Sequence, residues 1–261
     1  LAKLEKKLKF IELANEIAHQ NTVLLQTTMR AVAVTEQAIV NEEHRRGMIV
    51  PGRTKRVEGE AVTAAGAYVA TPKKGLHDWI GSCDINSLYP SVIRALNMGP
   101  ESIVGQIRPV ITSAEVNRAR FQKKSFAAAW DNQFGSWEYQ AVMNKERGTE
   151  IIIDWSDNTS VKMSAAQLYD LVFESNNQWM LSANGTIFTY EFEAIIPGLL
   201  KRWYAERQEM QRKMNECGDN EIEREFWDKR QLVKKINLNS LYGAILNPGC
   251  RFFDLRIGQS V

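Results

Sequence analysis

The chain has 261 residues, of which 44% are hydrophobic, so it can bury one large core or two small ones and is not disordered throughout. Lysine and arginine (33) nearly balance aspartate and glutamate (31), and the formal net charge of +2 excludes a purely electrostatic nucleic-acid binder. The three cysteines form no CxxC pair, which excludes a disulfide framework and a structural zinc site. With no apolar run of about 20 residues and no signal peptide, a cytoplasmic protein is expected.

The N-terminal region of the chain is expected to be helical. Apolar residues recur at intervals of three and four in residues 1–20, which predicts an amphipathic helix. A second helix is predicted over 36–46, with Thr35 as its N-cap and Gly47 at its end. Residues 50–63 are rich in proline, glycine and charge, so a surface loop is expected there.

A strand that passes into a helix is predicted next. Residues 79–85 alternate in polarity and become apolar around Cys83, so we expect a buried strand that ends at Asp84. Pro90 suits the first turn of a helix, where its missing N–H needs no partner, and Gly99 suits the end of that helix.

The middle of the chain is predicted to hold a β-hairpin and a short helix. Two runs with mostly apolar residues, at 151–154 and 161–163, are separated by polar turn residues, as in a hairpin. Ser164, with Gln167 three residues later, forms the capping box of a short helix.

Two long helices are predicted towards the C-terminus. They cover 197–217 and 221–246, are antiparallel, and are joined at Gly218. Residues 251–256 alternate in polarity and are expected to form a strand.

The turn after Asp84 has the chemistry of a magnesium site. The free N–H groups at the start of the following helix favour an anion, and the carboxylate beside them then requires a cation in between. A divalent ion such as Mg²⁺, bound by carboxylates and phosphate oxygens, satisfies both. The alternative is that Asp84 only caps the turn.

The long helices carry basic and polar groups on one side each. Arg207 interrupts an apolar stripe of the first helix, and Lys235, Asn239 and Tyr242 share a face of the second. A guanidinium and an ammonium group on two opposed helices can hold a polyphosphate. The alternative is a solvated charged face.

Two segments resemble known motifs. Residues 84–91, Asp-Ile-Asn-Ser-Leu-Tyr-Pro-Ser, resemble motif A (DxxSLYPS) of family B DNA polymerases. Residues 235–243, Lys-Ile-Asn-Leu-Asn-Ser-Leu-Tyr-Gly, resemble motif B (KxxxNSxYG), and the two occur in the order of the family. Residues 182–185 are similar to the segment before the fingers helix in replicative polymerases of T-even-like tailed phages.

The resemblance implies roles for the residues of motif A. Asp84 is expected to bind both catalytic Mg²⁺ ions, with the carbonyl of Ile85 assisting one of them. The backbone amides of Ser87 and Leu88 are expected to bind the nucleotide triphosphate. Tyr89 is expected to lie under the incoming sugar and to exclude a 2′-hydroxyl group.

Roles on the two helices are implied in the same way. Arg207, Lys235 and Asn239 are expected to bind the triphosphate of a dNTP, and Tyr242 and Gly243 to lie against the nascent base pair of a DNA primer-template.

The match to the family has three departures. Gln211 occupies a position where a second basic residue is expected. The template-binding segment appears at 64–67 without its tyrosine, so only Gly66 and Ala67 carry over as DNA contacts. No YxDTDS motif C, which supplies the other palm carboxylate, occurs in the chain.

The resemblance implies an α+β fold: a partial polymerase palm, formed by an antiparallel sheet with helices, plus a long antiparallel helical hairpin as the fingers domain and an inserted subdomain. The expected boundaries are 1–63 for a helical segment before the palm, 64–105 for the first palm segment with motif A, 106–180 for the inserted subdomain, 181–246 for the fingers with motif B, and 247–261 for the start of the second palm segment. Because the chain begins at Leu1 and stops before motif C, we expect a piece of a longer or naturally split protein.

Three functions remain open on the sequence alone. The first is a DNA-directed DNA polymerase fragment, inactive alone because one carboxylate is too few for two metal ions. If the enzyme is split, its expected partner is a second chain that carries motif C and the thumb. The second is a non-catalytic nucleotide- or DNA-binding module. The third is a self-sufficient phosphotransferase that uses Asp154 and Asp157, for which the plainer account is a turn stabilised by Asp and Asn.

Overall fold

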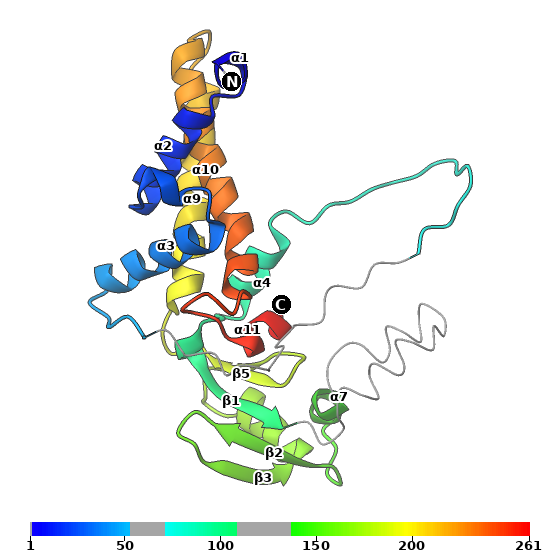
Figure 1. Ribbon diagram of the computed structural model, residues 1–261. Coiled ribbons are helices and arrows are strands. Elements are labelled where there is room, and N and C mark those ends of the chain that lie inside the picture. Colours follow the sequence, from blue (N-terminus) through cyan, green and yellow to red (C-terminus); the bar gives the residue numbers. More distant parts are fainter. Residues whose placement is uncertain (1, 53–70, 109–136) are drawn as a thin grey trace. The chain divides into compact units, whose positions relative to one another are not determined.

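The computed structural model describes residues 2–52, 71–108 and 137–261 (Figure 1). The chain divides into two compact units, Leu1–Val92 with Trp203–Leu255 and Ile93–Arg202 with Arg256–Val261. Gly66 and most of the loop predicted at 50–63 lie outside the described residues. No helix within the described ranges is long and apolar enough to cross a membrane.

The N-terminal helix is broken where the sequence predicts a continuous one. Helix α1 (Ala2–Leu8) ends at Lys9, whose φ of 51° is left-handed, and α2 (Phe10–Asn21) follows directly. A residue with this left-handed backbone conformation cannot continue a right-handed helix, so the chain changes direction there. A short 3₁₀ turn, η1 (Leu25–Thr27), comes after α2.

Helix α3 (Ala31–Arg45) starts earlier than predicted. Arg30 occupies its N-cap, so the assignment of Thr35 as the N-cap is wrong; Thr35 is buried inside the helix. The helix begins without a side-chain cap, and burial of Val34 stabilises its first turn. The predicted end is confirmed, because Gly47 follows the helix with a φ of 70°.

The helical hairpin is confirmed. Helices α9 (Ile195–Glu216) and α10 (Glu221–Ile245) are joined by a loop in which Gly218 has a φ of 55°. The Asn220 side chain caps α10 by accepting a hydrogen bond from the N–H of Glu223 at 3.2 Å. Helices α2 and α3 pack against α10 in the same unit (Figure 1).

Two predicted strands are absent. Residues 79–85 are irregular and exposed, and Cys83 is exposed rather than buried. No strand among the described residues pairs with them, and an unpaired strand is not stable. Residues 251–256 turn back instead, because the N–H of Phe253 donates to the carbonyl of Cys250 at 3.2 Å, and α11 (Leu255–Ser260) follows.

The second unit is built on an antiparallel sheet with the strand order β3-β2-β1-β5-β4. Its strands are β1 (Ile103–Arg108), β2 (Glu150–Trp155), β3 (Ser160–Ser164), β4 (Trp179–Leu181) and β5 (Thr186–Thr189). In the central pairing, Ile107 lies opposite Ile153, and both are buried in the core of this unit. The hairpin of β2 and β3 is confirmed.

Short helices cover this core. Helix α8 (Ala165–Tyr169) begins at the predicted capping box of Ser164 and Gln167 and continues into a π-helical turn, η3 (Asp170–Glu174). Helix α7 (Trp137–Met143) packs against α8.

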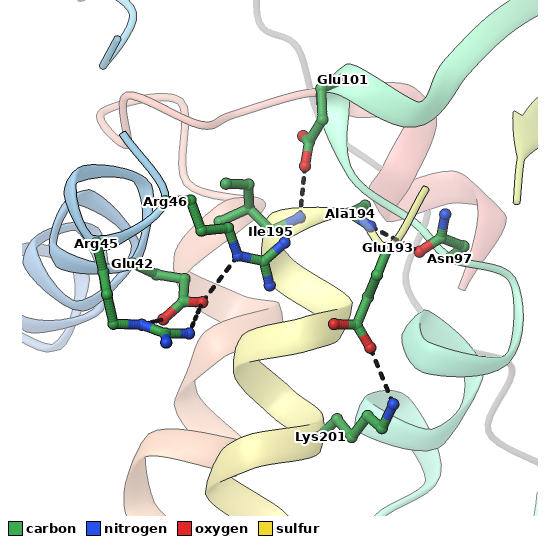
Figure 2. A network of polar contacts seen from close by, with 9 residues as sticks. All are labelled: Glu42, Arg45, Arg46, Asn97, Glu101, Glu193, Ala194, Ile195 and Lys201. Carbon is green, nitrogen blue, oxygen red and sulfur yellow. Dashed lines mark hydrogen bonds and ion pairs between the residues drawn. The ribbon is translucent and has the colours of Figure 1, made fainter. Parts of the chain in front are cut away.

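One buried asparagine fixes the start of α9. Helix α4 (Leu88–Ala95) ends just before Asn97, which has a left-handed φ of 49°. Asn97, and not Gly99 as predicted, is therefore the left-handed residue after this helix, and η2 (Pro100–Ser102) follows. The Asn97 amide donates to the carbonyls of Thr189 at 2.7 Å and Phe192 at 2.8 Å. Its oxygen accepts the N–H of Ala194 at 3.0 Å, just before α9 (Figure 2). Glu101 binds the next free N–H, that of Ile195, at 2.5 Å.

We expect Asn97→Ala to lower the free energy of unfolding by about 3 kcal/mol, because it leaves two carbonyls and one N–H without a buried partner. Asn158→Ala is the matched control. Asn158 also has a positive φ, 67°, but lies in the exposed turn of the β2–β3 hairpin, so only the backbone strain of about 1 kcal/mol remains. Urea unfolding of both variants measures the difference, and equal losses contradict the role of the hydrogen bonds.

Candidate functional site

The carboxylate of Asp84 is exposed to solvent. It lies in the irregular segment before α4, and no hydrogen bond or ion pair involves it within the part of the chain that the structure describes. Ser87, at the junction, has a left-handed φ of 53°, and its carbonyl accepts the N–H of Ser91 at 2.9 Å. The first N–H groups of α4 therefore face the end of the loop that carries Asp84. Pro90 lies in the first turn of α4, as predicted.

The tyrosines of the two motif-like segments are stacked on each other. The ring of Tyr89, in the first turn of α4, lies 4.4 Å from the ring of Tyr242, near the end of α10, with an angle of 23° between the planes. Burial, and then the nearby Tyr89 hydroxyl, raise the pKa of Tyr242 because both disfavour a phenolate. Two segments far apart in the sequence therefore meet at one pair of rings.

The exposed face of α10 carries the other polar groups predicted for the site. Lys235 and Asn239 are exposed and lie one turn apart, and Tyr242 follows on the same side. Lys235 forms no ion pair with any described residue, so its ammonium group is available to an anion. Gly243 is also exposed.

Arg207 reaches this face of α10 from the neighbouring helix. Its Nε donates to the Gln231 side chain at 3.3 Å, and Gln231 lies one turn before Lys235. The guanidinium group is partly buried, in agreement with its place in an otherwise apolar stripe. Arg207 therefore contacts α10 one turn before Lys235.

Two groups of ion pairs in the same unit each have one buried member. Lys234 of α10 lies 2.6 Å from Glu206 of α9, one residue before Arg207 in the sequence. Within α3, the buried carboxylate of Glu42 binds both Arg45, at 2.5 Å, and Arg46, at 2.9 Å (Figure 2). Separating the two helices would leave the buried ammonium group of Lys234 without this carboxylate, so the pair resists separation of α9 from α10.

The described residues do not form a complete metal site. Asp84 supplies one carboxylate and Ile85 one carbonyl, and no group of three or more His, Cys, Asp or Glu that could hold an ion occurs within the described ranges. Mg²⁺ requires several oxygen ligands in a fixed geometry. The donor set seen here therefore fits part of a magnesium site and not the whole of one.

Asp154 and Asp157 both have hydrogen-bonding partners on the sheet: Asp154 binds Arg108 of β1 and Ser160 of β3, and Asp157 binds Thr159 in its own turn. Asp154 accepts the Nε of Arg108 at 2.9 Å and the hydroxyl of Ser160 at 2.6 Å, and these hydrogen bonds lower its pKa. Asp157 accepts the N–H of Thr159 at 2.9 Å and its hydroxyl at 2.6 Å, which also lowers its pKa. Both carboxylates have a structural role here, which argues against the phosphotransferase interpretation.

Three residues near the site were not singled out in the sequence. Gln231 holds Arg207, while Asn21 and Asn237 form a buried contact behind the face of α10 that carries Lys235. The available signal was the low helix propensity of asparagine inside α10. That signal applies to Asn237 as well as to Asn239.

Comparisons with known proteins agree with the motifs. A family model described as DNA polymerase family B matches residues 20–261. The DNA-directed DNA polymerase of Escherichia phage RB69 is 22% identical over 99% of this chain, and that of Enterobacteria phage T4 is 23% identical over 99%. The alignments cover 28% of each phage protein, so the chain spans about a quarter of their length.

A solved structure shares the fold. The family B DNA polymerase from the hyperthermophilic archaeon Pyrobaculum calidifontis superposes with a TM-score of 0.59 at 16% identity. The match covers 98% of this chain and 25% of that structure. The mixed helical and antiparallel-sheet architecture is therefore that of a portion of such a polymerase.

We expect the Tyr89 and Tyr242 rings to stabilise the fold jointly. In a double-mutant cycle of Tyr89→Ala and Tyr242→Ala, the coupling in the free energy of unfolding should be about 0.5–1.5 kcal/mol. A control cycle pairs Tyr89 with Tyr169, which packs against Phe173 instead, at 4.9 Å. That control should be additive within about 0.5 kcal/mol. Additivity in the first cycle contradicts the stacking.

Proposed function

The chain belongs to DNA polymerase family B, and from this premise we propose that it provides the nucleotide-binding region of the palm and fingers of a DNA-directed DNA polymerase. The observation that carries the proposal is the stacking of Tyr89, in motif A, on Tyr242, in motif B, at 4.4 Å. In this function the chain binds a dNTP and a DNA primer-template, and the primer 3′-oxygen attacks the α-phosphorus in line with the leaving pyrophosphate.

Three polar groups of α9 and α10 support binding of the triphosphate. Arg207 and Lys235 supply two positive charges on one face, and Asn239 adds an uncharged donor there. Charged donors of this kind bind phosphate oxygens strongly and fix their orientation. The backbone amides of Ser87 and Leu88, at the start of α4, are proposed to bind the same triphosphate.

The stacked rings support selection of the sugar and the base pair. Tyr89 is held by Tyr242 and has little freedom to move aside, so it is suited to exclude a 2′-hydroxyl group from the space above it. Tyr242 and Gly243 are proposed to lie against the nascent base pair. A flat ring followed by a residue without a side chain leaves room for a base to pack closely.

Asp84 is proposed as the one carboxylate that the described residues contribute to the magnesium site. Its exposed position allows further ligands to approach from another chain or segment. We propose that a segment with motif C supplies them and that the chain alone transfers no nucleotide. The reaction is placed in the cytoplasm, of an infected cell if the protein is encoded by a phage.

Lys235→Ala should weaken binding of a magnesium–dNTP complex by about tenfold or more, because it removes a charge-assisted hydrogen bond to a phosphate. Isothermal titration with the 261-residue chain measures this. Affinity for a primer-template duplex should change much less.

The control for Lys235→Ala is Lys162→Ala, which removes the same charge from β3, where Lys162 pairs with Glu150 at 2.5 Å. The Lys162→Ala variant should keep the nucleotide affinity of the unmodified chain. Equal losses for nucleotide and DNA in Lys235→Ala count against a triphosphate clamp.

Primer extension should require a second chain that carries motif C and the thumb. Asp84→Ala should abolish the restored extension, because the metal site loses the ligand that this chain provides. Asp78→Ala is the matched control: Asp78 is an exposed aspartate of the same segment, and its removal should leave extension intact. In the same assay, Tyr89→Ala should incorporate ribonucleotides.

Other results of this assay have defined meanings. Extension that survives Asp84→Ala refutes the role of Asp84, and unchanged sugar selection refutes that of Tyr89. If nucleotide binding is retained but no second chain restores extension, the non-catalytic binding module is the better interpretation.

A further inference from the structure

A pair of buried asparagines joins α2 to α10 behind the candidate site. Asn21, the last residue of α2, is 1% exposed, and Asn237, within α10, is 4% exposed. The Nδ2 of Asn237 donates to the Oδ1 of Asn21 at 3.0 Å, and the reciprocal contact is 3.5 Å. Each amide is thus the partner of the other in a region that excludes water.

Further contacts fix Asn21 in place. Its Nδ2 also donates to the carbonyl of Ile17, in the preceding turn of α2, at 3.0 Å. Its backbone carbonyl accepts the side-chain amide of Asn41, from α3, at 3.1 Å. Asn21 is therefore held by contacts with α2 and α3, and it offers α10 a rigid hydrogen-bonding partner.

Asn237 lies between two predicted nucleotide ligands in the sequence and on the opposite side of the helix. Residues two apart on an α-helix point in nearly opposite directions, and residues four apart share a face. In agreement with this geometry, Lys235 and Asn239 are exposed, whereas Asn237 is buried. A rotation of α10 that broke the asparagine pair would turn Lys235 and Asn239 as well.

We propose that the Asn21–Asn237 pair is a positioning device, which sets the rotation and register of α10 and so aims Lys235 and Asn239 at the nucleotide. This inference rests on the proposed function and adds to it two residues that do not touch the substrate. A buried amide pair has one matched arrangement, because any shift leaves two polar groups without partners. A single buried asparagine is known to specify helix register in this way in coiled coils.

The other contacts between α2 and α10 are weaker determinants of register. Lys9 pairs with Glu225, and Lys229 pairs with Glu12, but each of these pairs is partly exposed to solvent. Exposed ion pairs contribute little and tolerate changes in geometry. The buried amides are consequently the contact that favours one register of α10 against α2 over the neighbouring registers.

The test uses the 261-residue chain with Asn237→Leu, and with Asn21→Leu and Asn237→Leu combined. The single variant should lose stability, because Asn21 keeps a buried amide without its partner. The double variant should recover stability, since two apolar side chains replace the polar pair. Its affinity for magnesium–dTTP should nevertheless stay roughly three- to tenfold below that of the unmodified chain. Affinity for a primer-template duplex should not change.

The matched control is Ile39→Val, which trims a residue of α3 that is 1% exposed. It should lower stability and leave nucleotide affinity unchanged. The inference is overturned if the double variant binds dTTP as the unmodified chain does, or if Ile39→Val weakens binding equally. A failure of the proposed function is recognised separately: the unmodified chain then binds no dTTP, or Lys235→Ala has no effect on binding, and the positioning role falls with it.

Discussion

Contact between the Tyr89 and Tyr242 rings is the interaction on which the candidate site depends. It ties the first turn of α4 to the last turns of α10, so the loop that carries Asp84 has a defined attachment to the helix that carries Lys235. Aromatic stacking suits this task, because flat rings bury a large area and prefer a narrow range of geometries. Without this contact, the acidic and basic halves of the site belong to separate segments of the chain.

One side of helix α10 packs against the neighbouring helices, and the other side carries the groups of the candidate site. The buried side attaches it to α2 through Asn237 and to α9 through Lys234, and α3 packs against it as well. The exposed side carries Lys235 and Asn239, whose side chains form no ion pair or hydrogen bond with the residues that the structure describes. A helix that must present ligands accurately benefits from a back face that allows one orientation only.

The sequence was sufficient for the elements whose signals are local. The α9–α10 hairpin, the β2–β3 hairpin and the capping box at Ser164 all rest on periodicity, turn residues and caps within a few positions. The predicted strand at 79–85 was wrong because a strand requires a partner, which its own residues do not reveal. Likewise, the motif residues were recognisable, whereas the pairing of Asn21 with Asn237 depends on packing between helices distant in sequence.

The N-terminal caps of α9 have a mechanical consequence. Asn97 and Glu101 bind the N–H groups of Ala194 and Ile195, where this helix begins, and its 22 residues then extend about 33 Å from that anchored end. A pivot of only about 5° at the base displaces the opposite tip by about 3 Å, simply from the length of the lever. A small adjustment of two hydrogen bonds at one end is therefore amplified into a movement the size of an atom's diameter at the other.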